Sequence, residues 1–377
     1  ERGASGSVRV RIGVDIGGTF TDLVLLDNNG QTDFAKVSST PEAPEEAVLA
    51  GISELLRRNG LHAATVDEVV HGTTVGSNTL LQRVGSPTGL ITTRGFRDVL
   101  EIGRLRTPGM FELDWDKPAP LVPRRHRLEV DERVASDGSV ITTLDESQVR
   151  TAGRALVEVG VTSVAVCFLN SYLNPQHERR AGNVLAEACA ELSVSLSIDV
   201  LPEAREYERT STVVVNAYVA RVLGSYLSRL ETGLADIGIH APLRVANSNG
   251  ALSAVETAKT KPVFFISSGR SAGVAGAAHL GGAMGRRDLI VFDMGGTTAS
   301  AALVHDGELS RLQEYEFRDG ISTSSRFIKA GGFLMRVPTV DVAEVGSGAG
   351  SIAHVDAGGL LQVGPVSAGA APGPACY

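Results

Sequence analysis

The chain has 377 residues, of which 43% are hydrophobic and 21% are charged. This balance is typical of a globular protein with a sizeable core, and the length allows two or three domains. The formal net charge of −8 argues against a general nucleic-acid-binding protein, and no apolar run approaches the roughly 18 residues that cross a membrane. The 3 cysteines are widely spaced, which excludes a disulfide framework and a Cys-x-x-Cys zinc site, so we expect a cytoplasmic protein.

The first half of the chain predicts strands that alternate with helices. It opens with a hairpin whose strands, 8–14 and 21–26, flank a Gly-Gly turn. Apolar residues at helical spacing and short apolar runs between turn residues predict the elements that follow. These are helices at 45–59, 146–159 and 174–192, strands at 66–71, 88–92 and 163–169, and a proline-rich irregular excursion at 104–140.

The second half predicts a similar alternation, and together the two halves favour a layered α/β architecture. The charged segment 206–210 is interpreted as the entry to a helix. We divide the chain into an N-terminal lobe, residues 8–205, and a second lobe, residues 206–377. The predicted elements of the second lobe are helices at 213–234 and 272–280 and strands at 243–246, 263–266, 288–297 and 300–304.

The same short motif occurs twice, at residues 15–19 and 293–297. Each copy has an apolar strand that ends in Asp, then two glycines and threonine, then a second apolar strand. A Gly-Gly-Thr turn exposes backbone N–H groups that can hold phosphate oxygens, and Asp at the strand end suits a hydrated Mg²⁺ or Mn²⁺. The motif resembles the phosphate hairpins of the actin, sugar-kinase and chaperone ATPase superfamily, which implies a two-lobed fold with a nucleotide cleft between the lobes.

We therefore predict an ATP site with Asp15 and Asp293 as metal ligands. The predicted nucleotide-binding residues are Asp15, Gly17, Gly18, Thr19, Thr21, Asp293, Gly295, Gly296, Thr297, Thr298, Gly348 and Gly350. A Walker A loop is absent from the sequence, because no Gly-Lys is followed by Ser or Thr.

A rival pattern lies at residues 269–273, which match the G-x-S-x-G of serine hydrolases and follow a predicted strand. His279, His305 and His354 lie downstream and could supply a base. This reading explains neither hairpin, so we favour the nucleotide site. A small-molecule kinase with the same hairpin is a further alternative.

Nearly the whole chain resembles the hydantoinase A and 5-oxoprolinase family. The motifs that carry this resemblance are VDIGGTFTDLVL, HGTTVGSNTLL, ITTRGFRDVLEIGR, EYERTSTVVVNAY, FDMGGTT and VGPVSAGAAPGPACY. The resemblance implies ATP-dependent phosphorylation of a carbonyl oxygen in its enol or lactim form, before hydrolysis of a cyclic amide or carboxylation of a ketone. On the side of this small-molecule carbonyl substrate we predict catalytic roles for His71, Thr73, Thr74, Asn78 and Arg209.

Departures from the family pattern favour the acetone and acetophenone carboxylase branch. The usual Gly-Gly-Thr-Ser-Thr-Asp ends here in Ala299 and Ser300, and the usual Ser-Gly-Pro-Ala-Gly-Gly has Arg270 in place of Pro. The alternatives are a cyclic-amide hydrolase and a non-catalytic assembly subunit. Family chains continue beyond the PGPACY stretch, which implies a truncated or short form. The resemblance also implies a hetero-oligomer with a hydantoinase B-type subunit and further small subunits.

Overall fold

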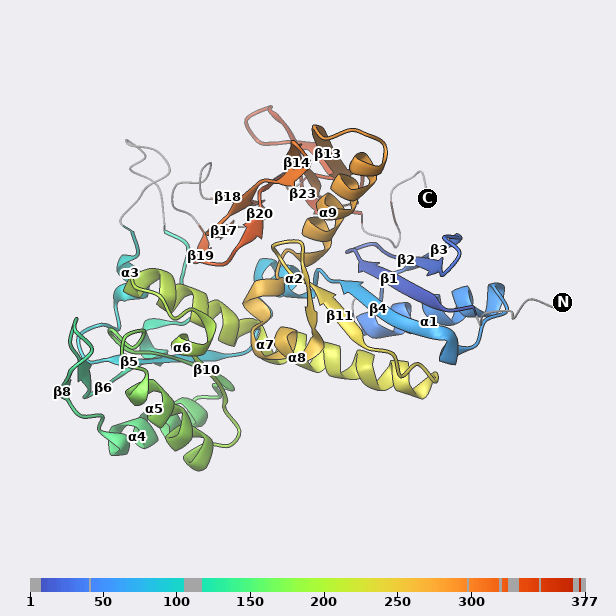
Figure 1. Cartoon of the computed structure of the whole chain (residues 1–377). Coiled ribbons are helices and arrows are strands. Elements are labelled where there is room, and N and C mark those ends of the chain that lie inside the picture. The colour runs from blue at the N-terminus through green and yellow to red at the C-terminus, as the bar shows by residue number, and fades with distance from the viewer. Residues whose placement is uncertain are drawn as a thin grey trace.

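The structure is a computed structural model of a mixed α/β protein, shown in Figure 1. Strands and helices alternate up to α9 (Ser268–Ala283), as the sequence predicts, and the described elements after it are strands. The structure describes residues 8–40, 42–104, 117–296, 298–318, 321–324, 332–345, 347–368 and 373.

The first sheet contains β1 (Val10–Ile16), β2 (Phe20–Asp27), β3 (Thr32–Ser38), β4 (Val66–Gly72), β11 (Leu243–Ala246) and β12 (Leu252–Ala254). Its strand order is β12-β11-β4-β1-β2-β3. The first three strands form an antiparallel meander, and β4 and β11 extend the sheet in parallel from β1. Buried and less buried residues alternate along β1, because successive side chains of a strand point to opposite faces.

Two helices, α1 (Pro44–Arg58) and α7 (Glu206–Asp236), share one hydrophobic core with the first sheet. Proline at the first position of α1, acidic residues in its first turn and arginines in its last turn all suit a helix there. In Figure 1, α7 runs beneath the first sheet and passes over the second sheet, on the side opposite α4 and α5, and its contacts with both α1 and the second sheet agree with this view.

The second sheet is parallel throughout and has the order β10-β9-β5-β6. Its strands are β5 (Thr88–Thr93), β6 (Arg127–Val130), β9 (Ser163–Cys167) and β10 (Ser193–Leu196). Every residue of β5 and β9 is buried, as is typical of parallel strands covered on both faces. Helices α4 (Glu146–Glu158) and α5 (Gln176–Ala188) pack against this sheet and each other.

The third sheet repeats the opening of the first. It contains β13 (Leu289–Met294), β14 (Ala299–His305), β15 (Glu308–Leu309) and β21 (Val342–Val345). β13 and β14 form a hairpin like β1 and β2, and β15 and β21 pair with opposite ends of β14, where β3 pairs with β2. Helix α9 (Ser268–Ala283) contacts β4 and β11 as well as β13, β14 and β15, so it connects the third sheet to the first.

Shorter elements complete the described chain. The helices are α2 (Val75–Leu81), α3 (Val99–Ile102), α6 (Ser197–Val200), α8 (Val255–Thr260), η1 (Ala63–Thr65), η2 (Arg124–His126) and η3 (Pro262–Phe265). The strands are β7 (Arg133–Val134), β8 (Val140–Thr142), β16 (Arg311–Leu312), β17 (Tyr315–Arg318), β18 (Ile321–Ser324), β19 (Phe333–Met335), β20 (Thr339–Val340), β22 (Ser351–Val355) and β23 (Leu361–Ser367).

Some sequence predictions were wrong in type or extent. The strand predicted at 263–266 is the 3₁₀ helix η3, because Pro262 favours a helical first turn and four apolar residues carry no decisive period. The helices predicted at 213–234 and 272–280 begin earlier, as α7 and α9. The excursion predicted at 104–140 contains β6, β7 and part of β8, while 105–116 lie outside the described residues. β11 and β12, from the predicted second lobe, join the first sheet.

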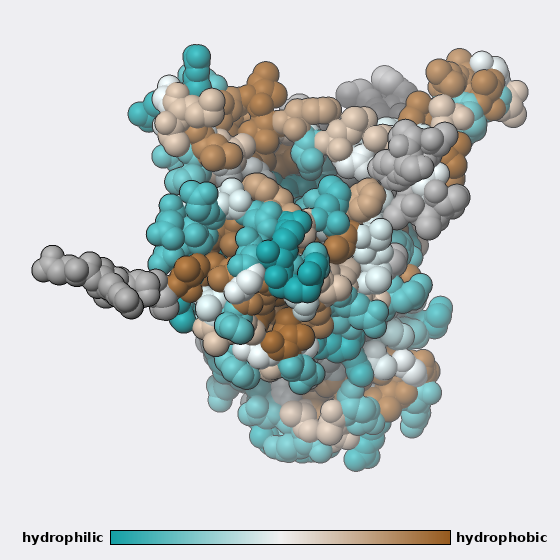
Figure 2. Space-filling view, turned by 90° about the vertical axis from the view of Figure 1, so that its right-hand side faces the viewer, coloured by the Kyte–Doolittle hydropathy of each residue, from teal (hydrophilic) through white to brown (hydrophobic). Residues whose placement is uncertain are grey.

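Apolar side chains are exposed on the third sheet. Among the described strands β13 pairs with β14 alone, whereas β1 pairs on both sides. Ile290, Phe292 and Met294 of β13 are each more than half exposed. Figure 2 shows hydrophobic residues gathered along the upper part of the face it presents. Within the part of the chain that the structure describes, no helix has the length and apolar character needed to cross a membrane.

Candidate functional site

The two Gly-Gly hairpins form as predicted and meet near their tips. The N–H of Gly17 and the N–H of Gly295 each donate to the carbonyl oxygen three residues later, at 2.9 Å. A methyl group at Gly296 would lie 2.7 Å from Thr19 Oγ1, so the second hairpin approaches the first more closely than any side chain at this position would allow. Two segments from opposite halves of the chain are thus in direct contact.

Three backbone donors at the hairpin tips have no protein partner within the part of the chain that the structure describes. Among the described residues, no hydrogen bond uses the N–H of Gly18, Thr19 or Gly296. Successive N–H groups of this kind bind the oxygens of an anion such as phosphate. Thr298 is half-buried at the second turn, and Thr297 lies outside the described residues.

A glycine-rich loop supports the second hairpin. Ala349 N–H donates to the carbonyl of Gly295 at 2.9 Å, and Gly350 N–H donates to that of Gly296 at 2.8 Å. Gly348 N–H donates to a serine hydroxyl of the same loop. The N–H groups of Gly348 and Gly350 therefore bond within the protein, and their contact with a nucleotide stays a prediction.

Asp15 lies at the end of β1, where three segments converge. A methyl group at Gly269 of α9 would lie 2.6 Å from Asp15 Oδ1, and one at Gly72 of β4 would lie 3.0 Å from it. The absence of side chains at these two glycines is therefore what allows α9 and β4 to approach the carboxylate.

Negative charge predominates around Asp15. Its side chain still reaches solvent, but the packing around it removes enough water to raise its pKa, and the carboxylates of Asp22 and Asp293 raise it further. The guanidinium of Arg270 lowers this pKa to a smaller extent. Arg270 is itself paired with Glu344, with Nη1 and Oε1 at 2.6 Å. The excess of carboxylates favours a bound cation.

The donors at this place fit a magnesium–nucleotide complex. Mg²⁺ at nucleotide sites keeps several waters and takes one or two carboxylates plus phosphate oxygens. Asp15 and Asp293 offer such a pair, because the negative charge of Asp293 acts on the carboxyl group of Asp15 and raises its pKa. The described residues include no group of three or more His, Cys, Asp and Glu side chains that could hold a metal by themselves.

The His-Gly-Thr-Thr segment braces the first hairpin. Thr74 Oγ1 donates to the carbonyl of Ile16 at 3.0 Å, and Asn78 Nδ2 donates to Thr74 Oγ1 at 3.3 Å. Ser268 Oγ accepts from Thr73 N–H at 3.0 Å and donates to the Thr73 carbonyl at 2.9 Å, which joins the first residue of α9 to this segment. Thr73, Thr74 and Asn78 therefore lie beside the hairpin, as predicted residues of one site would.

Thr21 has a supporting position. It is fully buried, and its Oγ1 lies 3.0 Å from Ser39 Oγ. Ser39 Oγ in turn donates to the carbonyl of Gly17 at 2.9 Å. Thr21 therefore supports the turn through Ser39, and its side chain is buried beneath the hairpin.

His71 is fully buried in the core instead of facing the hairpin tips. Its Nε2 lies 2.7 Å from the hydroxyl of Tyr226 on α7. Its Nδ1 has no partner of normal geometry among the described residues, although it faces the backbone of its strand neighbour Val14. Burial lowers the pKa of His71 to about 4, so the imidazole is neutral at physiological pH. The catalytic role of His71 stays a prediction, and its imidazole contacts α7 rather than the hairpin tips.

Arg209 is also buried away from the hairpins, near the start of α7. Its guanidinium donates to the carbonyls of Glu203, at 2.9 Å, and Phe168, at 2.5 Å, and lies over the ring of Tyr172. These contacts join α7 to the end of β9. Arg209 is thus not brought together with the other predicted site residues.

Sequence patterns alone did not single out an ion-pair cluster around Arg104. Its guanidinium lies 2.6 Å from Glu208 and 2.7 Å from Glu314, and so connects the segment after α3 to α7 and to the segment before β17. Arg104 ends the ITTRGFRDVLEIGR motif and Glu208 lies in the EYERT motif. Their positions in these two motifs were the only sign in the sequence that the two residues could matter. Ser268, Gly269 and Glu344 were missed too, because their roles depend on contacts distant in sequence.

The serine hydrolase reading is wrong about its context. Ser271 lies inside α9, which follows the 3₁₀ helix η3 rather than a strand. Its hydroxyl is buried and donates to the carbonyl of Ser248 at 2.8 Å. A nucleophile elbow needs an exposed serine at a strand-to-helix turn. Ser271 is buried, and it does not lie at such a turn.

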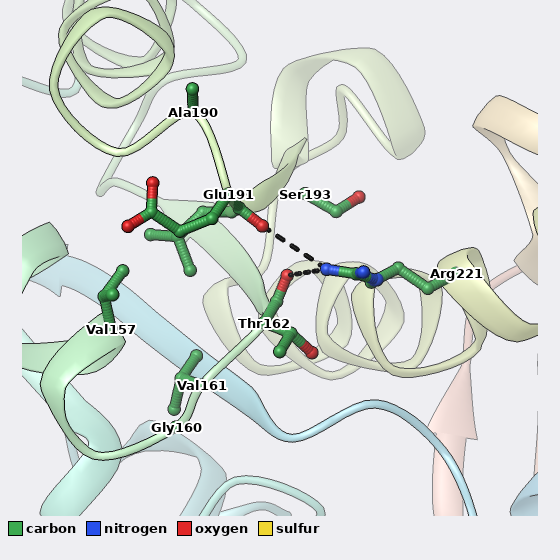
Figure 3. A pocket seen from close by; sticks show the side chains of 9 residues that line it. Val157, Gly160, Val161, Thr162, Ala190, Glu191, Ser193 and Arg221 are labelled. Atoms are coloured by element: carbon green, nitrogen blue, oxygen red, sulfur yellow. Dashed lines mark hydrogen bonds between the residues drawn. The ribbon is translucent and has the colours of Figure 1, made fainter.

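A surface pocket of about 630 Å³ lies elsewhere, at the starts of β9 and β10. In Figure 3 the side chain of Arg221 reaches toward the chain at Thr162 and Glu191, and it donates to their carbonyls at 3.4 and 3.3 Å. Ligand sites of parallel sheets form at the carboxyl ends of strands, so this pocket at the amino ends is not the candidate site.

The sequence matches known proteins over most of its length. Residues 11–189 match the family model described as the hydantoinase/oxoprolinase N-terminal region, and residues 209–377 match the hydantoinase/oxoprolinase model. The chain is 36% identical to the caprolactamase subunit alpha of Pseudomonas jessenii over 97% of this chain and 52% of that one. It is also 36% identical to the acetophenone carboxylase gamma subunit of Aromatoleum aromaticum, over 97% of this chain and 50% of that one.

The fold has solved counterparts too. A nucleotide-free structure from work on ATP-dependent acetone carboxylation superposes with a TM-score of 0.84 at 29% identity, over 96% of this chain and 52% of that one. The chain spans about half the length of the curated relatives it matches. On these matches, which together cover both halves of the sequence, the chain belongs to the hydantoinase/oxoprolinase family.

Proposed function

We propose that this chain binds Mg²⁺–ATP between its two hairpins, as the nucleotide-binding subunit of an enzyme that activates a carbonyl group. One observation carries the proposal: the hairpins touch at Thr19 and Gly296, and backbone donors with no partner among the described residues lie there beside two carboxylates. Donors that are fixed before the ligand arrives stabilise phosphate charge without reorganisation.

We further propose that the fold is the two-lobed actin-like ATPase fold. The meander β1–β2–β3 flanked by parallel β4 and β11, and the repeat of its hairpin in β13 and β14, support this. The lobes are proposed as residues 8–205 and 206–377, with β11 and β12 crossing to the first sheet.

In this proposal each part of the site has a task. The N–H groups of Gly18, Thr19 and Gly296 orient the phosphates, and Asp15 and Asp293 hold the metal with its waters. ATP held by these residues would supply the phosphoryl group that activates the carbonyl oxygen of the substrate, and ADP would be left in the site. Positioning and charge neutralisation by these residues are then most of the catalysis.

For the reaction we prefer carboxylation of a ketone of the acetone or acetophenone kind. Ala299 and Ser300 replace the polar and acidic end of the usual family hairpin, and the acetophenone carboxylase subunit is 36% identical. Hydrolysis of a cyclic amide is the second candidate, because the caprolactamase subunit is equally identical. Phosphate release from ATP with ketone and bicarbonate, against release with lactams or 5-oxoproline, separates them. Release with the cyclic amides alone would overturn our preference.

Both relatives named above are subunits, which supports a hetero-oligomer. We propose a hydantoinase B-type partner, and that the complete enzyme requires it. Copurification of tagged chain from the native source, followed by mass spectrometry, tests this partner.

The nucleotide site can be tested on the chain itself by calorimetric titration with Mg²⁺–ATP. Asp15→Asn and Asp293→Asn are expected to weaken binding at least about tenfold, or roughly 1.4 kcal/mol. Asp27→Asn is the control, because Asp27 caps the exposed turn at the other end of β2. Absence of binding by the unaltered chain would contradict the proposal and favour an assembly subunit.

A further inference from the structure

Arg270 occupies a special place in the proposed ATP site. It lies in the first turn of α9, directly after the glycine that packs against Asp15. Its side chain is only 16% exposed and its Nη1 lies 2.6 Å from Glu344 Oε1.

Glu344 belongs to the same face of the third sheet as Asp293. Across the antiparallel pairs, Glu344 on β21 lies opposite Ser300 on β14, which lies opposite Asp293 on β13. Residues directly opposite each other in an antiparallel pair share a face. The side chain of Glu344 is only 6% exposed, so its charge is largely removed from water.

The equivalent row of the first sheet is different. Asp15 on β1 lies opposite Asp22 on β2, and Asp22 lies opposite Lys36 on β3. Lys36 Nζ donates to Asp22 Oδ2 at 2.8 Å, so this row contains its own cation. The second row ends in an acid, Glu344, and among the described residues Arg270 of α9 forms an ion pair with it.

A guanidinium that is paired with one carboxylate can exchange it for a phosphate. Arginine binds both groups through the same planar fork, and the terminal phosphates of ATP carry more charge than a carboxylate. Arg270 directly follows Gly269, where a methyl group would lie 2.6 Å from Asp15 Oδ1, so phosphates held beside Asp15 lie near the start of the arginine side chain. Glu344 then competes with the ligand for Arg270.

We propose that Arg270 binds the phosphates of ATP and that Glu344 holds it in place before the nucleotide enters. This inference rests on the proposed ATP site and deepens it. It makes opposite predictions for the two partners of one ion pair. Loss of the arginine weakens nucleotide binding, whereas neutralisation of the glutamate strengthens it.

The test is calorimetric titration of the chain with Mg²⁺–ATP and with adenosine, which has no phosphate. Arg270→Gln is expected to weaken ATP binding by about 10- to 100-fold, the size of a lost charge-assisted hydrogen bond, and to leave adenosine binding unchanged. Glu344→Gln is expected to strengthen ATP binding severalfold. In Arg270→Gln/Glu344→Gln this gain is expected to disappear.

Glu203→Gln is the matched control, because Glu203 pairs with Arg336 at 2.6 Å in another part of the fold. It is expected to leave ATP affinity unchanged. Weaker ATP binding by Glu344→Gln would overturn the inference, since a merely structural ion pair suffers from loss of either partner. If the unaltered chain binds ATP and Arg270→Gln binds it equally, this inference alone fails. If the unaltered chain binds no ATP, the proposed function fails with it.

Discussion

Thr19 and Gly296 lie against each other, one in each copy of the duplicated hairpin. A methyl group at Gly296 would come within 2.7 Å of Thr19 Oγ1, a distance that real side chains do not tolerate. The glycine is therefore required by the contact between the hairpins as well as by its own turn.

Gly296→Ala is expected to separate the hairpin tips and to weaken Mg²⁺–ATP binding at least about tenfold, or roughly 1.4 kcal/mol. Gly276→Ala is the control, because no atom lies within 4 Å of a methyl group there. It is expected to leave ATP affinity unchanged. Calorimetric titration measures both, and equal affinities in the two variants would contradict the contact.

Gly269→Ala and Gly273→Ala form a matched pair within α9. A methyl group at Gly269 would lie 2.6 Å from Asp15 Oδ1, whereas one at Gly273, four residues later, meets no atom within 4 Å. We expect Gly269→Ala to displace the carboxylate and lower affinity for Mg²⁺–ATP. Gly273→Ala is expected to raise stability by roughly 0.5–1 kcal/mol, because alanine favours a helix more than glycine does. ATP titration and thermal unfolding of both variants check this, and an unchanged affinity in Gly269→Ala would count against it.

Because burial lowers the pKa of His71, we expect the protein to lose stability in mild acid. Its pKa falls from 6.5 to about 4 on folding, so the unfolded chain binds the proton more tightly. The neutral imidazole of His71 contributes fully to the free energy of unfolding above pH 6.5. This contribution, about 3 kcal/mol in all, is lost as the pH falls toward 4. Urea unfolding of the unaltered chain and of His71→Gln between pH 7 and 4.5 measures it. The glutamine variant is expected to depend less on pH, and an identical dependence would contradict the assignment.

We expect removal of the Arg209 side chain to destabilise the fold rather than to weaken substrate binding specifically. Arg209→Ala removes both donors to the Glu203 and Phe168 carbonyls and is expected to destabilise the fold by roughly 2–4 kcal/mol. Arg221 also donates to two backbone carbonyls, but at the exposed surface. Arg221→Ala is expected to change stability by less than about 1 kcal/mol. Chemical unfolding compares the two, and a native-like Arg209→Ala would show that the buried contacts matter little.

The sequence by itself determined the repeated local unit. Apolar strands that end in Asp, with Gly-Gly turns between them, are short-range patterns, so both hairpins form where they were predicted. Long periodic helices such as α1 and α4 also follow from local spacing. The motifs in combination were sufficient for the family, because they extend over nearly the whole chain.

Only the tertiary structure decided which of the predicted polar residues lie at the site and which support the core. The orientation of His71 depends on Tyr226, 155 positions away, and the placement of Arg209 depends on carbonyls at the end of β9. Arg270 drew attention in the sequence as a departure, but its partner Glu344 became visible only when β21 paired with β14. Local pattern fixes the direction of a side chain relative to its own strand or helix, while the neighbours that bury or pair it come from segments far away in the chain.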